Sequence, residues 1–122
     1  MYFPVFVIKW QLHSKRLERT MESIIEKNRR AIEELCHRYH VARLDVFGSL
    51  VLGDFNEFSD IDFLVEFDSE VGKRRFDNFF ELLRAMEQLF HRRVDLVEEG
   101  GLRNPYFIKS VNETRRPVYV AA

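Results

Sequence analysis

The segment from residue 61 to residue 67, IDFLVEF, places the strongest constraint on the fold of this chain. It combines aromatic and β-branched residues in a run of strand length, which predicts a buried β-strand. Shorter runs of the same kind lie at residues 43–47, 93–97 and 118–120, and Pro117 favours an edge position for the last one. Segments with helical periodicity separate these strands. The alternation predicts an α/β (α+β) fold in which helices cover a small mixed β-sheet.

Three helices are predicted around these strands. The first runs from about residue 23 to residue 40, opens on a capping box formed by Ser23 and Glu26, and buries Cys36. The second spans residues 72–90, and the third runs from an N-cap at Asn104, followed by Pro105, to about residue 111. The residues expected on the inner face of the second helix are Phe76, Phe79, Phe80, Leu83, Met86 and Phe90.

A length of 122 residues corresponds to one domain. Residues 1–20 differ from the rest, because an apolar decapeptide is followed by a basic, polar stretch. We therefore predict an N-terminal extension at residues 1–20 and a compact domain at residues 21–122, and we expect the chain to fold without the extension. The decapeptide lacks the marks of a signal peptide, no apolar run approaches the ~20 residues of a membrane span, and Cys36 is the single cysteine. These features predict a cytoplasmic protein without a membrane partner.

The charge of the chain is nearly balanced. Lys and Arg number 19 and Asp and Glu number 20, which gives a formal net charge of -1. This balance gives no general attraction to nucleic acid, and it favours a protein as the partner. The apolar residues 1–10 offer a surface for pairing with a second copy, so a homo-oligomer stays open.

The residues that carry chemistry are concentrated between residues 46 and 67. A strand ends at Gly48–Ser49, where glycine lets backbone N–H groups approach a phosphate and the serine adds a hydroxyl donor. After ten further residues, Asp60 and Asp62 occupy positions i and i+2 of a strand, so their carboxylates share one face, about 6–7 Å apart. Asp95 stands in the third strand, between apolar residues that face away from it.

Three carboxylates on one sheet face repel one another, and divalent cations such as Mg²⁺ relieve that repulsion. Two such ions can bridge the attacking and leaving oxygens of a phosphoryl displacement. Each part also has a plain reading, since Gly-Ser after a strand is most often a turn and two aspartates in a strand can line a solvated edge. The combination is more specific than its parts, and two aspartates within one strand do not fit the acidic cluster of a receiver domain.

The order of these residues resembles the minimal nucleotidyltransferases of the DNA polymerase β-like superfamily. That family is marked by G-S, ten residues, D-x-D, and a third Asp on a later strand, which here are Gly48-Ser49, Asp60-Ile61-Asp62 and Asp95. The strand sequences SDIDFLVEF and RRVDLVEEG and the closing PVYV extend the likeness to about residues 22–120.

The resemblance implies helices packed on one side of the sheet and a Mg²⁺-dependent transfer of AMP from ATP onto a hydroxyl of a partner macromolecule. By position, Gly48 and Ser49 would hold the β- and γ-phosphates. Asp60 and Asp62 would coordinate two Mg²⁺ ions, and Asp95 would bind the catalytic ion and help to deprotonate the acceptor hydroxyl. Minimal members of the family often act as antitoxins beside a helical HEPN-type toxin, and some adenylylate a tyrosine on that partner.

One position departs from the family pattern. Leu52 stands where the family usually has an arginine that helps to hold the nucleotide phosphates. Its loss should weaken phosphate binding by about 1.5–3 kcal/mol. Two functions therefore stay open: an active nucleotidyltransferase, and a module of the same fold, weak or inactive in catalysis, that neutralises its partner by binding alone. An orphan nucleotide- or metal-binding domain is a weaker third hypothesis.

Other polar residues are interpreted more plainly. His37, His40 and His91 show no metal-ligand spacing and are expected at the surface or at helix ends. The basic pairs and triplets at residues 73–75 and 92–93 are expected to be solvated. The apolar run Leu50-Val51-Leu52 either packs inward or contributes to a partner-binding surface.

Overall fold

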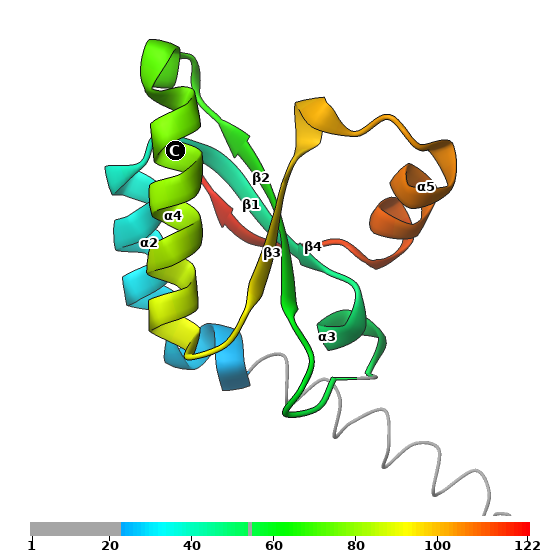
Figure 1. The fold of residues 1–122 in the computed structure, drawn as a ribbon. Helices are drawn as coiled ribbons and strands as arrows, with labels where there is room; N and C mark the ends of the chain where they lie inside the picture. Colours follow the sequence, from blue (N-terminus) through cyan, green and yellow to red (C-terminus); the bar gives the residue numbers. More distant parts are fainter. Residues whose placement is uncertain (1–22, 54) are drawn as a thin grey trace, which may run out of the picture.

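The computed structural model describes residues 23–53 and 55–122. Residues 23–27 are helical and lead into the first labelled helix. The elements then follow as α2 (Arg29–Arg38), β1 (Val41–Phe47), α3 (Ser49–Leu52), β2 (Ile61–Phe67), the 3-10 helix η1 (Ser69–Arg74), α4 (Arg75–Phe90), β3 (Val94–Glu98), the 3-10 helix η2 (Glu99–Gly101), α5 (Pro105–Thr114) and β4 (Arg116–Val120) (Figure 1). The extension predicted at residues 1–20 lies outside the described residues.

The four strands form one mixed sheet in the order β3-β2-β1-β4. β1 pairs antiparallel with β2 and with β4, while β2 and β3 run parallel. The mixed sheet predicted from the sequence is confirmed, and β4 lies at an edge, where Pro117 is tolerated.

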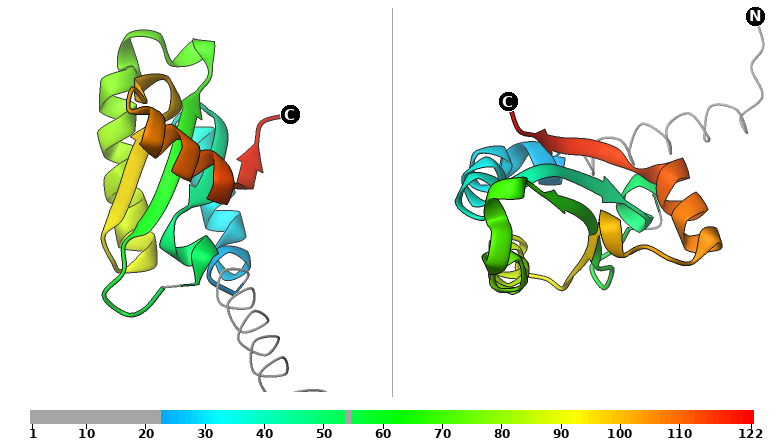
Figure 2. Two further views of the ribbon diagram at one scale, coloured as in Figure 1. Left: turned by 90° about the vertical axis from the view of Figure 1, so that its right-hand side faces the viewer. Right: turned by 90° about the horizontal axis from the view of Figure 1, so that it is seen from above.

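Helices α2 and α4 pack side by side against one face of the sheet (Figure 2). Their contact with the sheet forms the main hydrophobic core, whose most deeply buried members include Ile32, Cys36, Leu44, Val46, Ile61, Phe63, Val65, Leu82 and Met86. The prediction that Cys36 is a core residue is confirmed. Burial raises the pKa of its thiol to about 12, so the thiol stays protonated and unreactive at neutral pH.

Helix α5 lies on the opposite face of the sheet (Figure 2). Its residue Val111 packs with Phe47 and Leu64, and the ring of Phe107 meets that of Phe47 edge-on at a centroid distance of 6.0 Å. The helix begins as predicted, because the Asn104 side chain accepts hydrogen bonds from the backbone N–H groups of Tyr106 and Phe107 and Pro105 occupies the first turn. This face therefore carries a second, smaller core in addition to polar residues.

The first predicted helix differs in detail from the observed one. The helix is interrupted at Asn28, whose side chain donates a hydrogen bond to the carbonyl oxygen of Ile24, and it ends at Arg38. Ser23 is itself helical, and the Glu26 carboxylate accepts hydrogen bonds from Arg29. The prediction of a capping box at Ser23 and Glu26 is therefore wrong, because Ser23 lies within the helix and Glu26 bonds to Arg29.

The inner face predicted for the helix at residues 72–90 is partly wrong. Gly72 has non-helical dihedrals, so α4 begins at Arg75, and Phe76 and Phe80 are 72% and 41% exposed. The deeply buried positions are Asn78, Leu82 and Met86. Asn78 faces inward because its amide donates a hydrogen bond of 3.0 Å to the carbonyl oxygen of Tyr39 near the end of α2. The buried face of α4 therefore includes a polar residue, and a search for apolar periodicity does not find this face.

None of the described helices is both long enough and apolar enough to span a membrane.

Candidate functional site

Asp62 and Asp95 lie side by side on adjacent parallel strands. They are register partners in the β2–β3 pairing, and neighbouring strands lie about 4.8 Å apart. Their chain neighbours alternate as predicted, since Ile61, Phe63, Val94 and Leu96 are buried in the core on the other face. The two carboxylates therefore share the face opposite α2 and α4, near the start of both strands.

Asp60 precedes the first residue of β2 and is half-buried. It is predicted to lie within the strand and instead lies directly before it, and its negative charge still acts on Asp62. Burial raises the pKa of Asp62 to about 6, with further contributions from the negative charges of Asp95 and Asp60. The structure thus brings the three predicted aspartates together, and the repulsion between their charges contributes to the raised pKa of Asp62.

The Gly48–Ser49 segment closes the site from the end of β1. Phe47 is the register partner of Asp62, so the chain passes the carboxylate directly as it enters α3. Gly48 has a φ of +72°, and a Cβ atom built there would lie 2.3 Å from Asp62 Oδ2. Only glycine fits this position. The backbone N–H of Ser49 bonds to the Asp62 carboxylate and acts against the rise in its pKa.

The short helix α3 follows Gly48 directly and is capped at its C-terminal end by Gly53 in the left-handed conformation. Its apolar residues divide between the two expected environments. Leu50 is buried, Val51 packs partly against the main core, and Leu52 is 60% exposed. Where the family places a phosphate-binding arginine, this chain therefore presents an exposed aliphatic side chain.

Arg92 has a structural role that the sequence does not predict. Its guanidinium donates hydrogen bonds to the carbonyl oxygens of Asn56 (3.1 Å) and Ser59 (2.9 Å) and lies 4.4 Å from the centre of the Phe55 ring. The expectation of a solvated side chain is wrong for this residue. Arg92 holds the loop that leads into Asp60 against the start of β3.

Two further supports come from the end of α5, and neither was identified from the sequence. The Thr114 hydroxyl accepts a hydrogen bond of 3.1 Å from the backbone N–H of Gly48. The adjacent Arg115 pairs with Asp45, a fully buried carboxylate on β1, and with Glu99. Contacts separated by 66 and 70 residues along the chain leave no local sequence pattern.

The basic triplet at residues 73–75 lies away from the aspartates. Arg75 pairs with Glu98, which is at the far end of β3 from Asp95. A pocket of about 820 Å³ lies at this end and includes Arg43, Glu66, Gly72 and Glu98 in its lining. It contains none of the residues of the predicted site, which lies at the opposite end of β2 and β3.

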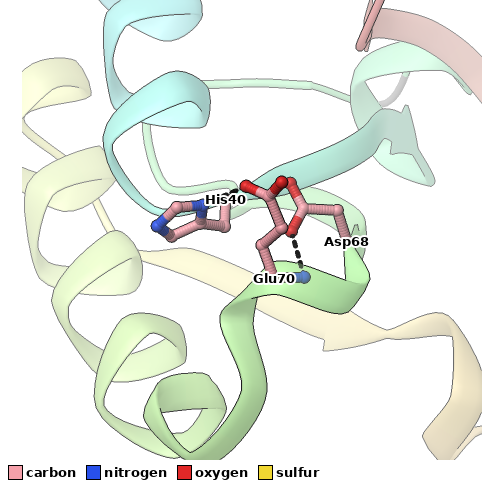
Figure 3. Close-up of side chains that lie close together, drawn as sticks. All are labelled: His40, Asp68 and Glu70. Carbon is pink, nitrogen blue, oxygen red and sulfur yellow. Dashed lines mark hydrogen bonds and ion pairs between the residues drawn. The ribbon is translucent and has the colours of Figure 1, made fainter.

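His40, Asp68 and Glu70 form a second group of potential metal ligands (Figure 3). Their ligand atoms all lie within 4.8 Å of one another, a closer spacing than that of the three aspartates among the described residues. The prediction that His40 has no carboxylates in ligand range is wrong, because antiparallel pairing of β1 with β2 brings Asp68 next to it. Asp68 caps η1 by accepting from the backbone N–H of Glu70, and His40 Nδ1 lies 4.0 Å from Glu70 Oε2. The three side chains therefore lie together at the N-terminal cap of η1.

The geometry at Asp62 fits a divalent cation and a phosphate chain. Three carboxylates that repel one another, of which those of Asp60 and Asp62 are half-buried, supply the hard oxygen ligands that Mg²⁺ prefers. The Ser49 hydroxyl, at the start of α3, offers a hydrogen-bond donor at the same edge of the sheet. Such an arrangement can bind a nucleotide and assist displacement at phosphorus.

Comparison with curated proteins identifies relatives of the chain. A Methanocaldococcus jannaschii protein that carries the provisional name protein adenylyltransferase is 36% identical over 93 residues, which are 76% of this chain and 89% of the relative. The protein adenylyltransferase MntA of Thermococcus cleftensis is 36% identical over 84 residues, which are 69% of this chain and 79% of the relative.

Solved structures give the same result. One that is described provisionally as a minimal nucleotidyltransferase has a TM-score of 0.65 and 35% identity, and the match covers 80% of this chain and 95% of the other. A chain from the complex of a tri-AMPylated Shewanella oneidensis HEPN toxin with an MNT antitoxin has a TM-score of 0.53 and 17% identity over 80% of this chain and 73% of the other, so it shows the shared fold alone. The model of the nucleotidyltransferase domain family matches residues 28–118. The chain therefore belongs to the nucleotidyltransferase domain family, as the G-S and D-x-D pattern predicts.

Proposed function

We propose that this protein transfers AMP from ATP, with Mg²⁺, to a hydroxyl group of a partner protein, and that it acts as the antitoxin of a HEPN-type toxin. The observation that carries the proposal is that Asp62 and Asp95 are neighbours on adjacent strands, and that the Ser49 backbone N–H bonds to the Asp62 carboxylate. A divalent cation is the ligand that explains carboxylates held together in spite of their mutual repulsion.

The roles of the residues follow from their positions. Asp60 and Asp62 would hold the metal ions together with Asp95, and the Ser49 hydroxyl would bind the β- and γ-phosphates where the glycine at position 48 lets them approach. Mg²⁺ supplies charge neutralisation for the triphosphate and the leaving pyrophosphate. Asp95, the most exposed of the three carboxylates, stands where an acceptor hydroxyl arrives and takes its proton. The acceptor oxygen forms a bond to the α-phosphorus as the bond from that phosphorus to the bridging oxygen of pyrophosphate breaks.

The partner and the nucleotide are supported by the relatives and by the charge of the chain. Two relatives carry names that specify adenylyl transfer to protein, and a chain of the same fold comes from a complex of an MNT antitoxin with an AMPylated HEPN toxin. The formal net charge of -1 favours a protein over a bare nucleic acid as the acceptor. A cytoplasmic location belongs to the same proposal.

The test is a transfer reaction with ATP labelled at the α-phosphate, Mg²⁺ and the protein encoded beside this one. The wild-type protein is expected to label the neighbour, and Asp62→Asn and Asp95→Asn are expected to abolish labelling. Glu57→Gln is the matched control, because Glu57 is an exposed carboxylate in the loop before Asp60. Equal labelling by the wild type and Asp62→Asn would contradict the proposal.

A second function is favoured by one observation, the exposure of Leu52. Without the arginine usual at this position, nucleotide binding is weaker, and the protein then neutralises its partner by covering it. In the same experiment this alternative predicts a stable complex with the neighbour and no label transfer. It also predicts that Asp62→Asn protects cells from the toxin as well as the wild type does.

A further inference from the structure

Thr114 makes a directed pair of hydrogen bonds at the back of the candidate site. Its side-chain oxygen accepts from the backbone N–H of Gly48 (3.1 Å) and donates to the carbonyl oxygen of Ser110 (3.1 Å). The residue is 6% exposed, so water does not replace these partners. Donation to Ser110, four residues earlier in α5, orients the hydroxyl so that a lone pair faces Gly48.

The end of α5 that carries Thr114 is fixed to β1. Arg115 donates a hydrogen bond of 2.6 Å to Asp45, which has no exposed surface, and another of 2.9 Å to Glu99. One turn earlier, Val111 packs against Phe47. The ion pairs of Arg115 thus hold this end of the helix, and the Thr114 hydroxyl is a fixed support for the backbone that follows β1.

The backbone that Thr114 supports lies in close contact with Asp62. The Cα atom of Gly48 lies so close to Asp62 Oδ2 that a methyl group has no room there, and the next N–H group bonds to the same carboxylate. A rotation of the Gly48 peptide would displace Ser49 and its contact with Asp62 together.

We propose that Thr114 is a positioning residue for nucleotide transfer: its hydroxyl fixes the Gly48 peptide so that Ser49 and Asp62 keep the mutual orientation that the reaction needs. The proposal rests on the proposed function, because it assigns Thr114 to the same site. Thr114 does not touch the reacting atoms, and it acts through Gly48.

Three variants separate this role from simple packing. Thr114→Val keeps the shape of the side chain and removes the hydroxyl. Thr114→Ser keeps the hydroxyl and removes the methyl group. Val111→Ala is the packing control, because it leaves a cavity beside Phe47 in the same helix and keeps the hydrogen bond at Gly48.

Two readouts are used, both under conditions in which circular dichroism shows each variant to be folded. Thr114→Val is expected to lower kcat for AMP transfer about 10-fold to 100-fold with a smaller change in the KM for ATP, because a misplaced loop costs orientation rather than contacts. Thr114→Ser and Val111→Ala are expected to keep the wild-type kcat. In amide hydrogen exchange followed by NMR, Gly48 is expected to lose protection in Thr114→Val while the rest of β1 keeps it.

The outcomes distinguish the two proposals. Failure of the wild type to transfer AMP would overturn the proposed function and, with it, the catalytic consequence of Thr114. Wild-type protection of Gly48 in Thr114→Val would overturn the positioning role whether or not transfer occurs. Equal losses of kcat in Thr114→Val and Val111→Ala would reduce Thr114 to a packing residue and overturn the proposal as well.

Discussion

Neutralising Asp62 is expected to stabilise the protein at neutral pH in the absence of metal. The carboxylate is half-buried between Gly48 and Asp95, and burial with the charges of Asp95 and Asp60 raises its pKa to about 6. At pH 8 the group is ionised, so the folded state carries the full cost of this charge. Asparagine has nearly the same shape, removes the charge, and keeps an oxygen that can accept from the Ser49 N–H.

The magnitude follows from the change in pKa. A rise from the ordinary 3.8 to about 6 is about 2 pH units, or about 3 kcal/mol at 1.36 kcal/mol per unit. Because the group is only half-buried, solvent screening reduces this to about 1–1.5 kcal/mol. Asp62→Asn should therefore increase the free energy of unfolding by that amount at pH 8.

The pH dependence has a definite sign. Between pH 3.8 and about 6, the folded protein holds the Asp62 proton more tightly than the unfolded chain does. Wild-type stability therefore falls as the pH rises through this window, and the loss is complete above it. The advantage of Asp62→Asn should be full above pH 6 and absent below pH 4.

The assay is urea unfolding of both proteins across this pH range in EDTA, with Glu57→Gln as the control for loss of an exposed carboxylate. Mg²⁺ should then stabilise the wild type and leave Asp62→Asn unchanged, because a ligand that binds only the folded state adds its binding free energy to stability. An Asp62→Asn variant that is no more stable than the wild type at pH 8 would refute the claim that the charge of Asp62 destabilises the folded state.

Three further changes test other parts of the site. Gly48→Ala is expected to abolish AMP transfer, because the new Cβ would lie 2.3 Å from Asp62 Oδ2; wild-type transfer rates would contradict the close approach. Leu52→Arg is expected to tighten ATP binding about 10-fold or more in calorimetry, and an unchanged Kd would show that this position does not reach the phosphates. Arg115→Met is expected to lower the free energy of unfolding by about 3 kcal/mol in urea, because Arg43 is then the one ionic partner that the buried Asp45 keeps among the described residues. A loss of less than about 0.5 kcal/mol would contradict this.

The parts of the site that the sequence predicts are those defined by local spacing. Alternation within β2 and β3 places Asp62 and Asp95 on one face, because strand side chains alternate with a period of two whatever the rest of the chain does. Gly48–Ser49 is found for the same reason, since a glycine at the end of a strand that opens a helix is a local signal.

The parts that the sequence does not predict depend on distant partners. Asn78 is buried because it bonds to the carbonyl oxygen of Tyr39, so the face of α4 cannot be assigned from apolar periodicity alone. Thr114 and Arg92 form hydrogen bonds with backbone groups. Because backbone groups of this kind occur in residues of every type, the sequence does not reveal these contacts. His40 meets Asp68 only once β1 and β2 pair. In each case the missing information is a contact between segments far apart along the chain.

The central claim is that the aspartates and the Gly48–Ser49 segment direct transfer of a nucleoside monophosphate, with pyrophosphate as the leaving group. The most direct measurement compares ATP labelled at the α-phosphate with ATP labelled at the γ-phosphate in reactions with the neighbouring protein and Mg²⁺. The account predicts that the α-label becomes covalently attached to the acceptor and that the γ-label is recovered in pyrophosphate. Attachment of the γ-label, or equal α-labelling by Asp62→Asn, would contradict it.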